Sequence, residues 1–303
     1  MNKVGILIPV FNKLEYTKKC LKNLSDIFST DKSIDSLYEI IIIDDASTDG
    51  TYEWISKNCK DVHILQGDGN LWWSGGINMG AKYAVKELEC THVLLWNNDI
   101  EVKQEYFKNL TGLLGEYDQN VIIGSKIYGN LEKNLVWSMG GIFNSRTGES
   151  YMIGYLKEDS EELQSPVNAD WLTGMGTLVP SKVIRRIGYW DAKRYPQYIG
   201  DMEYTYRARI NGFKNIAVPN LKIWNDTKNT GLLHEGHLKN LFKMLTDKRS
   251  LYNFRVNFSF YRQYATSPLA YKFLLKDYFK FFAGFFKWKL LGLFGMKKKA
   301  YFN

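Results

Sequence analysis

Two carboxamides and one carboxylate stand directly after an apolar run in this 303-residue chain. Asn97, Asn98 and Asp99 follow residues 93–96. Because polar groups of this kind do not continue inside a sheet, we expect these side chains at its carboxyl edge, where open α/β sheets bind their ligands. A carboxylate there suits Mg²⁺ or Mn²⁺ beside a phosphate-bearing ligand, since such a cation needs few protein oxygens. The alternative is a strand followed by a plain polar turn.

A second acidic pair, Asp44 and Asp45, follows the apolar run 40–43. An acidic side chain at the end of a strand can accept hydrogen bonds from a base N–H or a ribose hydroxyl. The alternative is that each carboxylate caps the helix that follows. The first predicted turn, residues 9–12, has none of the spaced glycines that bring the backbone against a pyrophosphate, which argues against a dinucleotide-dependent dehydrogenase.

Residues 69–80 form a glycine- and asparagine-rich stretch at a predicted helix start. Each glycine inside a helix costs about 0.5–1 kcal/mol relative to alanine, and close approach of a ligand would account for that cost. The aromatic pair Trp72 and Trp73 could stack on a sugar or fill the core.

Alternating strands and helices position these groups. The apolar pattern predicts strands at 4–10, 40–43, 62–65, 93–96, 121–123 and 216–219 and helices at 14–28, 74–88, 181–186 and 201–210. The alternation predicts an α/β fold with a mostly parallel sheet and right-handed crossovers. In residues 124–169 the apolar pattern becomes irregular, and the glycine-rich, polar sequence is compatible with hairpins. The chain after residue 238 is predicted to be helical to its end.

The composition is that of a globular protein of the cytoplasm. Hydrophobic residues make up 45% and charged residues 24%. The three cysteines have no paired or metal-ligand spacing and are interpreted as reduced thiols. The opening apolar run lacks a basic leader, and no run is long enough to span a bilayer, so neither a signal peptide nor a transmembrane helix is expected.

The net charge of +8 is concentrated at the end of the chain. Residues 271–303 hold eight lysines and one aspartate, interleaved with aromatic residues. A basic, aromatic amphipathic helix predicts peripheral binding to an anionic membrane, here the inner face of the cell membrane. The alternative is a helix packed on the catalytic domain or on a second subunit of a homodimer. Nucleic acid is not expected as a partner, because this segment is rich in phenylalanine and has no arginine.

Taken in order, five motifs of the chain resemble those of glycosyltransferase family 2. They lie at residues 8–12, 44–51, 69–80, 97–99 and 200–201. The resemblance covers about residues 3–225. Within the family, the chain is most similar to the bacterial branch that builds surface polysaccharides and includes rhamnosyltransferase-like enzymes. The resemblance implies a nucleotide-diphosphate sugar donor, a divalent cation (Mg²⁺ or Mn²⁺) and inversion at the anomeric carbon. Together with the membrane binding predicted for the basic tail, it leads us to expect a glycan or polyprenyl-diphosphate-linked acceptor.

The resemblance also implies a domain plan and a set of site residues. A GT-A catalytic domain would occupy residues 1–228, with a nucleotide-sugar part at 1–124 and an acceptor and catalytic part at 125–228, followed by a helical region at 229–303. Donor-binding residues would be Pro9, Phe11, Asn12, Asp44, Asp45, Asn70, Trp73, Gly75, Gly76, Asn78, Asn97 and Asn98. The acceptor would contact Trp171 and Gly174.

Two carboxylates carry the implied chemistry. Asp99 would be the metal ligand, as the one carboxylate present in the family's DxD element, with His234 as a further candidate. Asp201 would be the catalytic base, since a carboxylate at a helix start can take the proton of an attacking hydroxyl; its alternative role is a helix cap. The alternative functions are a sugar-1-phosphate nucleotidyltransferase and a non-catalytic membrane-associated scaffold.

Overall fold

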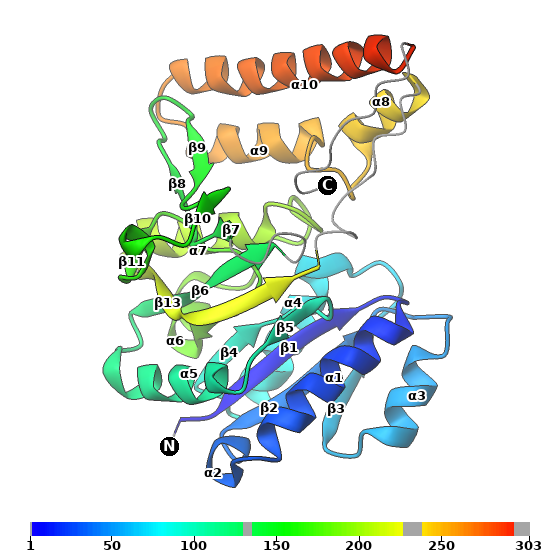
Figure 1. Cartoon of the computed structure of the whole chain (residues 1–303), viewed down its shortest axis with the longest axis vertical. Coiled ribbons are helices and arrows are strands. Elements are labelled where there is room, and N and C mark those ends of the chain that lie inside the picture. Colours follow the sequence, from blue (N-terminus) through cyan, green and yellow to red (C-terminus); the bar gives the residue numbers. More distant parts are fainter. Residues whose placement is uncertain (1, 130–134, 227–237, 294–303) are drawn as a thin grey trace.

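The fold is a central mixed sheet covered by helices, with three further helices stacked at one end (Figure 1). A computed structural model describes residues 2–129, 135–226 and 238–293. The helices are α1 Leu14–Phe28, α2 Lys32–Asp35, α3 Thr51–Asn58, α4 Trp72–Lys86, α5 Glu105–Glu116, α6 Ser181–Ile187, α7 Gly200–Ile210, α8 Leu238–Thr246, α9 Phe254–Tyr264 and α10 Leu269–Leu293, with a 3-10 turn at Glu161–Leu163. The strands are β1 Val4–Val10, β2 Tyr38–Asp44, β3 Val62–Gln66, β4 His92–Leu95, β5 Ile100–Val102, β6 Val121–Gly129, β7 Leu135–Ser138, β8 Gly141–Phe143, β9 Ser150–Met152, β10 Lys157–Glu158, β11 Val167–Ala169, β12 Thr177–Pro180 and β13 Lys214–Asn225.

The sheet is parallel in its first half and mostly antiparallel in its second. Its main path runs β10-β7-β6-β12-β4-β1-β2-β3, and β4, β1, β2 and β3 pair in parallel. Strand β12 then runs antiparallel to β4, while β13 is parallel to β6 and antiparallel to β5 and β11. The prediction of a mostly parallel sheet is met by β4, β1, β2 and β3 and by the pairing of β13 with β6, whereas the other pairs in the second half are antiparallel.

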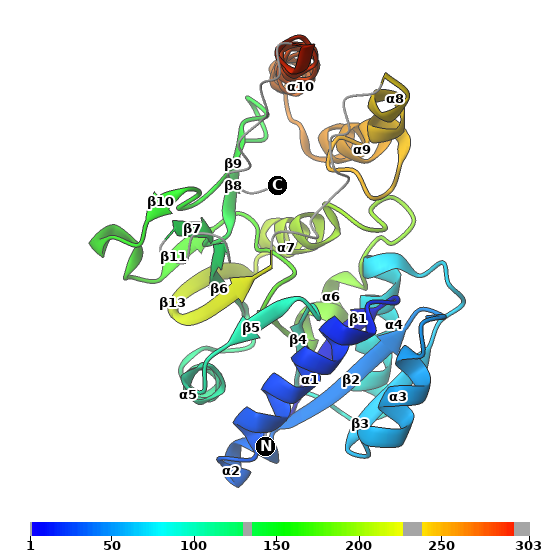
Figure 2. The same ribbon diagram turned by 45° about the vertical axis from the view of Figure 1, so that its right-hand side comes forward.

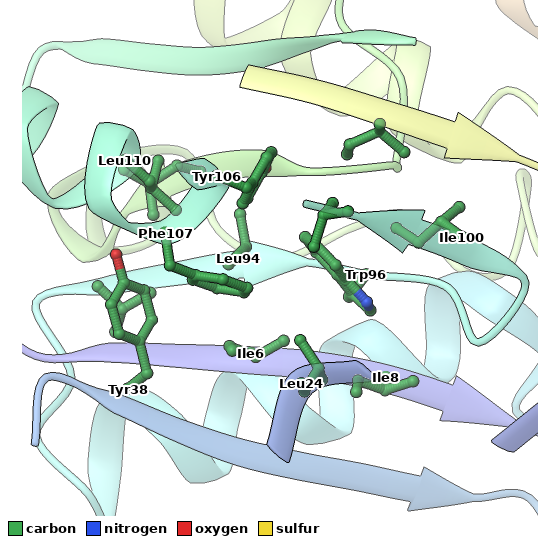
Figure 3. Packing of buried hydrophobic residues seen from close by; sticks show 14 of the residues in the cluster. Ile6, Ile8, Leu24, Tyr38, Leu94, Trp96, Ile100, Tyr106, Phe107 and Leu110 are labelled. Carbon is green, nitrogen blue, oxygen red and sulfur yellow. The ribbon is translucent and has the colours of Figure 1, made fainter. Parts of the chain in front are cut away.

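An aromatic core lies between the sheet and helices α1 and α5. Trp96, Tyr106 and Phe107 are fully buried there and contact one another in edge-on and tilted pairs. Leu24 of α1 and Ile6 of β1 close the cluster from the other side (Figure 3). The burial of Trp96 directly before Asn97 anchors the chain at the point where β4 gives way to the polar turn.

Two glycines of the 69–80 stretch serve the packing of α4 on the sheet. A Cβ at Gly80 would lie 2.7 Å from Cδ1 of Ile43, and one at Gly76 would lie 3.0 Å from Cβ of Pro9. The interpretation that these glycines exist for ligand approach is therefore wrong for Gly80. Gly76 combines both roles, because it also borders the cavity described below.

The C-terminal helices form a layer above the second half of the sheet, with α10 outermost (Figures 1 and 2). Phe143 of β8 packs edge-on against Phe260 and Tyr261 of α9. The Tyr261 hydroxyl donates to the Gly148 carbonyl over 2.6 Å. No helix in the described ranges is long and apolar enough to cross a membrane.

Candidate functional site

A cavity of about 660 Å³ opens at the carboxyl ends of β1, β2 and β4. Its walls come from the ends of β1, β2 and β4, from the start of α4, from the loop before α7 and from the loop between α8 and α9. The lining residues are Pro9, Val10, Phe11, Lys13, Ile43, Asp45, Gly69, Trp72, Trp73, Gly76, Asn98, Asp99, Gln197, Tyr198, Asp247, Lys248 and Arg249. Seven residues predicted to bind donor or metal are therefore brought together: Pro9, Phe11, Asp45, Trp73, Gly76, Asn98 and Asp99.

Asp45 organises the loop that leads into α4. One carboxylate oxygen accepts from the Gly69 N–H over 2.8 Å, and the other accepts from the Trp72 N–H over 3.1 Å. These bonds hold Trp72 in the left-handed region at φ 58°, which is uncommon for a non-glycine residue. Asp44 is buried and accepts from the Ser47 N–H over 3.1 Å, so it braces the loop before α3 and does not cap that helix.

Trp73 connects the cavity to the start of α7. Its indole N–H donates to Asn97 over 3.0 Å, and its ring lies directly over Gly174, where a Cβ would come within 2.3 Å of Cζ2. The Gly174 N–H in turn donates to a carboxylate oxygen of Asp201 over 2.7 Å. Trp73, Asn97, Gly174 and Asp201 thus form one continuous chain of contacts.

Asp201 lies in the first turn of α7 with both oxygens accepting backbone hydrogen bonds. The second bond comes from the Met202 N–H over 2.9 Å. Burial raises the pKa of this carboxyl above its ordinary value, although the two hydrogen bonds oppose the shift. A carboxylate with a raised pKa is a better proton acceptor, as a general base requires. The residue before the helix, Ile199, is in the left-handed region at φ 67°.

Asp99 has the properties of a cation ligand. Its Oδ1 is buried and has no hydrogen-bond partner. Burial first, and the charge of Asp226 second, raise the pKa of Asp99 to about 6. A bound cation would satisfy the orphaned oxygen and favour its ionised form. In the described ranges no three His, Cys, Asp or Glu side chains gather as a metal cluster, so Asp99 fits a Mg²⁺ or Mn²⁺ ion that takes most of its ligands from a diphosphate.

Comparison with known families decides the identity of this site. The family model described as "Glycosyl transferase family 2" matches residues 5–175, more than half of the chain. The chain belongs to glycosyl transferase family 2. Among curated relatives, it is 27% identical over 192 residues to the low-salt glycan biosynthesis hexosyltransferase Agl10 of Haloferax volcanii. That match covers 62% of this chain and 59% of Agl10, so the chain spans less than two thirds of that relative.

Solved structures share the fold of this family 2 chain. GalNAc-T7 with UDP, GalNAc and Mn²⁺ superimposes with a TM-score of 0.59 at 12% identity, covering 89% of this chain and 58% of that one. The mannosyltransferase PcManGT from Pyrobaculum calidifontis, in complex with GDP-Man and Mn²⁺, gives a TM-score of 0.55 at 14% identity, covering 90% and 68%. The GT-A fold predicted from the sequence is confirmed.

Several residues predicted for the family 2 site lie outside the cavity lining. They are Asn12, Asp44, Asn70, Gly75, Asn78 and Asn97, together with Trp171, Gly174 and the predicted base Asp201. Asn78 bonds both backbone groups of Trp190, and Asn12 accepts from the Thr48 N–H, so both side chains brace loops. Trp171 is 8% exposed and packs over Gly141. His234 lies outside the described residues.

Sequence reasoning missed the contribution of two loops to the family 2 cavity. Gln197 and Tyr198 come from the loop before α7, and the Gly200–Asp201 motif that follows them is the signal that could have found them. Lys248 and Arg249 come from the break between α8 and α9, inside a region predicted to be continuously helical.

Glu203, a second carboxylate on α7, has a structural role in the family 2 chain. It is buried and pairs with Arg207 over 2.8 Å. The Tyr264 hydroxyl of α9 donates to the same oxygen over 2.6 Å, so this cluster ties α7 to the C-terminal helices. Glu203 is thus bonded to α9, whereas Asp201 is bonded to Gly174, which lies against the Trp73 ring.

We expect Glu203→Ala to lower the free energy of unfolding by about 3 kcal/mol, because it leaves the Arg207 guanidinium with no counter-charge in a largely buried position. Denaturant unfolding curves measure this loss. The control is Arg209→Ala, which removes the half-exposed pair with Asp170 and should cost about 0–1 kcal/mol. Equal effects of the two variants would contradict the structural role of Glu203.

Proposed function

We propose that the chain is an inverting glycosyltransferase that moves a sugar from a nucleotide diphosphate to a hydroxyl of a glycan acceptor. The observation that carries the proposal is the contact chain from Asp201 through Gly174 to Trp73, because Trp73 shares a cavity with Asp99. The candidate base lies outside the cavity lining, and this contact chain links it to the cavity that the candidate cation ligand borders. The names of the relatives support this reaction class, since Agl10 is a hexosyltransferase of glycan biosynthesis.

In the proposed mechanism Asp201 accepts the proton of the acceptor hydroxyl as its oxygen attacks the anomeric carbon. The nucleotide diphosphate leaves from the opposite face, so the configuration inverts. A cation held at Asp99 would stabilise the charge that develops on the leaving diphosphate. Asn98 and Asp45 line the donor cavity, and the ring of Trp73, which also lines it, packs against Gly174 on the proposed acceptor side.

The domain plan remains part of the proposal. The donor-binding part at residues 1–124 supplies β1, β2, α4 and Asp99, and the part at 125–228 supplies the base and Gly174. The rings of Trp72 and Trp73 form an apolar wall beside the cavity, which suits a deoxysugar such as rhamnose, as well as galactose or an N-acetylhexosamine. A lipid-linked acceptor of surface-polysaccharide synthesis is the proposed substrate.

A screen of nucleotide sugars tests the reaction class. With one sugar of the panel we expect release of the nucleoside diphosphate that needs Mg²⁺ or Mn²⁺ and stops with EDTA. The alternative enzyme, a sugar-1-phosphate nucleotidyltransferase, would release inorganic diphosphate from a nucleoside triphosphate instead. A non-catalytic scaffold would bind without turnover. Either of these results would overturn the proposal.

The outer face of α10 supports peripheral binding to an anionic membrane at the cytoplasmic side. Four apolar side chains that share one helical face are exposed: Leu275, Phe279, Phe286 and Leu290. Four exposed lysines run alongside this stripe at 272, 276, 280 and 287. The apolar side chains that the sequence predicts for this helix include Leu274, Phe281 and Phe285, which are buried; Leu274 packs in one cluster with residues of α9, as the alternative of a packed helix predicts. Apolar residues beside lysines complement lipid headgroups of negative charge.

We expect the double variant Phe279→Glu/Phe286→Glu to lose binding to phosphatidylglycerol vesicles in a flotation assay, while the wild-type chain floats with them and not with phosphatidylcholine vesicles. Ile210→Glu is the matched control, because it also changes an exposed apolar residue but lies at the end of α7. If the face instead binds a second subunit, the double variant will change the molecular mass in solution and leave flotation unaltered.

A further inference from the structure

The donor cavity needs positive charge that its helix terminus does not supply. The N-terminus of α4 borders the cavity, and helix N-termini commonly bind phosphates through free N–H groups. Here the Trp72 N–H donates to Asp45, the Trp73 N–H to Gln197 over 3.3 Å, and the Ser74 N–H to the Pro196 carbonyl over 2.9 Å. The first N–H groups of α4 are therefore committed to the protein, and a diphosphate must be bound by other groups.

The loop between α8 and α9 brings two basic side chains to this cavity. Lys248 and Arg249 line it together with Asp99. The loop has a defined shape, because the Asn253 side chain donates to the carbonyls of Thr246 and Asp247 over 2.9 and 3.1 Å. The carboxamide oxygen of Asn253 also accepts from the Val256 N–H and caps α9. The position of the basic pair thus follows from the helix ends on either side.

The two basic residues differ in the charge that they leave available. Arg249 is paired with Asp247 through two contacts of 3.1 and 3.2 Å, so its charge is largely neutralised. The Lys248 ammonium lies 4.9 Å from the centroid of the Trp72 ring, and no carboxylate of the described ranges is within ion-pair distance of it. A cation–π contact positions an ammonium without cancelling its charge.

We propose that Lys248 binds the diphosphate of the nucleotide sugar in the cavity that it lines together with Asp99. The inference rests on the proposed function and extends it, because it makes the C-terminal helical region a part of the donor site. The Lys248 ammonium is positioned by its contact with the Trp72 ring, and the hydrogen bond from the Trp72 N–H to Asp45 holds Trp72 in its left-handed conformation. Lys248 stabilises both the bound donor and the departing diphosphate, since each carries the same negative groups.

The experiment is calorimetric titration of UDP, GDP and dTDP, and of the matching nucleosides, into the full chain with and without Mn²⁺. For the diphosphate that binds, Lys248→Ala is expected to weaken affinity about tenfold, since a hydrogen bond to a charged group is lost. Lys248→Arg keeps a charge at the site and should stay within about threefold of wild type. Lys243→Ala, an exposed lysine of α8 outside the cavity lining, should not differ from wild type. Nucleoside affinity should be equal in all four proteins.

The outcomes separate the inference from the function on which it rests. If the wild-type chain binds none of the diphosphates, the proposed donor site is wrong. If wild type binds one and Lys248→Ala binds it equally well, only the role of Lys248 is overturned. A parallel loss of nucleoside binding in Lys248→Ala would also overturn it, because that result indicates a disturbed pocket; thermal melting of each variant checks the fold.

Discussion

Asp201→Asn is expected to lower turnover by about 10²–10⁴-fold, because the amide cannot accept the proton of the acceptor hydroxyl. The substitution keeps the size of the side chain, and its remaining oxygen can still accept the Gly174 N–H. Affinity for the nucleoside diphosphate should therefore change little. The measurement is steady-state release of nucleoside diphosphate with the donor sugar found in the screen, combined with calorimetric titration of the product.

Glu203→Gln is the matched control for this loss, since it makes the same chemical change two residues along α7. Glu203 is bonded to Arg207 and Tyr264, so this variant should lose stability and keep turnover per folded molecule. Turnover of Asp201→Asn at the wild-type level would overturn its assignment as the base. A loss of diphosphate affinity equal to the loss of turnover would instead indicate that Asp201 holds the pocket together.

The first half of the fold could be predicted because its central strands β1 and β4 are buried on both faces. The apolar run 4–10 coincides with β1, and the helical spacing at 14–28 coincides with α1. Strand β13 was predicted as 216–219 but extends from 214 to 225. Pro219 and the polar residues near it interrupt the apolar pattern, whereas pairing with β6 continues past a bulge. The length of β13 is decided by its partner strands, which cannot be identified from the local sequence pattern.

The position of a site residue could be predicted where an acidic residue directly follows a predicted strand, because the end of the strand places that residue at the edge of the sheet. Asp99 and Asp45 border the cavity because β4 and β2 end there. Lys248 could not be found in this way, since nothing in the local sequence relates residue 248 to residue 72. Gly80 was misread for a related reason: a glycine that admits a neighbouring strand and a glycine that admits a ligand look alike in a sequence.

Asp99→Asn is expected to abolish stabilisation of the protein by Mn²⁺ plus nucleoside diphosphate and to lower turnover by about 10²-fold or more, because the cation loses its anionic protein ligand. Melting temperature with and without Mn²⁺ measures the first effect. In the absence of a cation the same variant should be as stable as wild type or more so. Its neutral amide removes a buried carboxylate that lies near the charge of Asp226.

The pH dependence of stability gives an independent check on Asp99. Its pKa of about 6 in the folded chain exceeds the ordinary value near 4, so between these values the folded state binds more protons than the unfolded state. Cation-free wild type should therefore lose about 2 kcal/mol of stability through this group as the pH rises from 4 to 6. Asp99→Asn should lack that component. Because protons and the cation compete for one carboxylate, stabilisation of wild type by Mn²⁺ should weaken below about pH 6. Retention of both effects in Asp99→Asn would place the cation elsewhere.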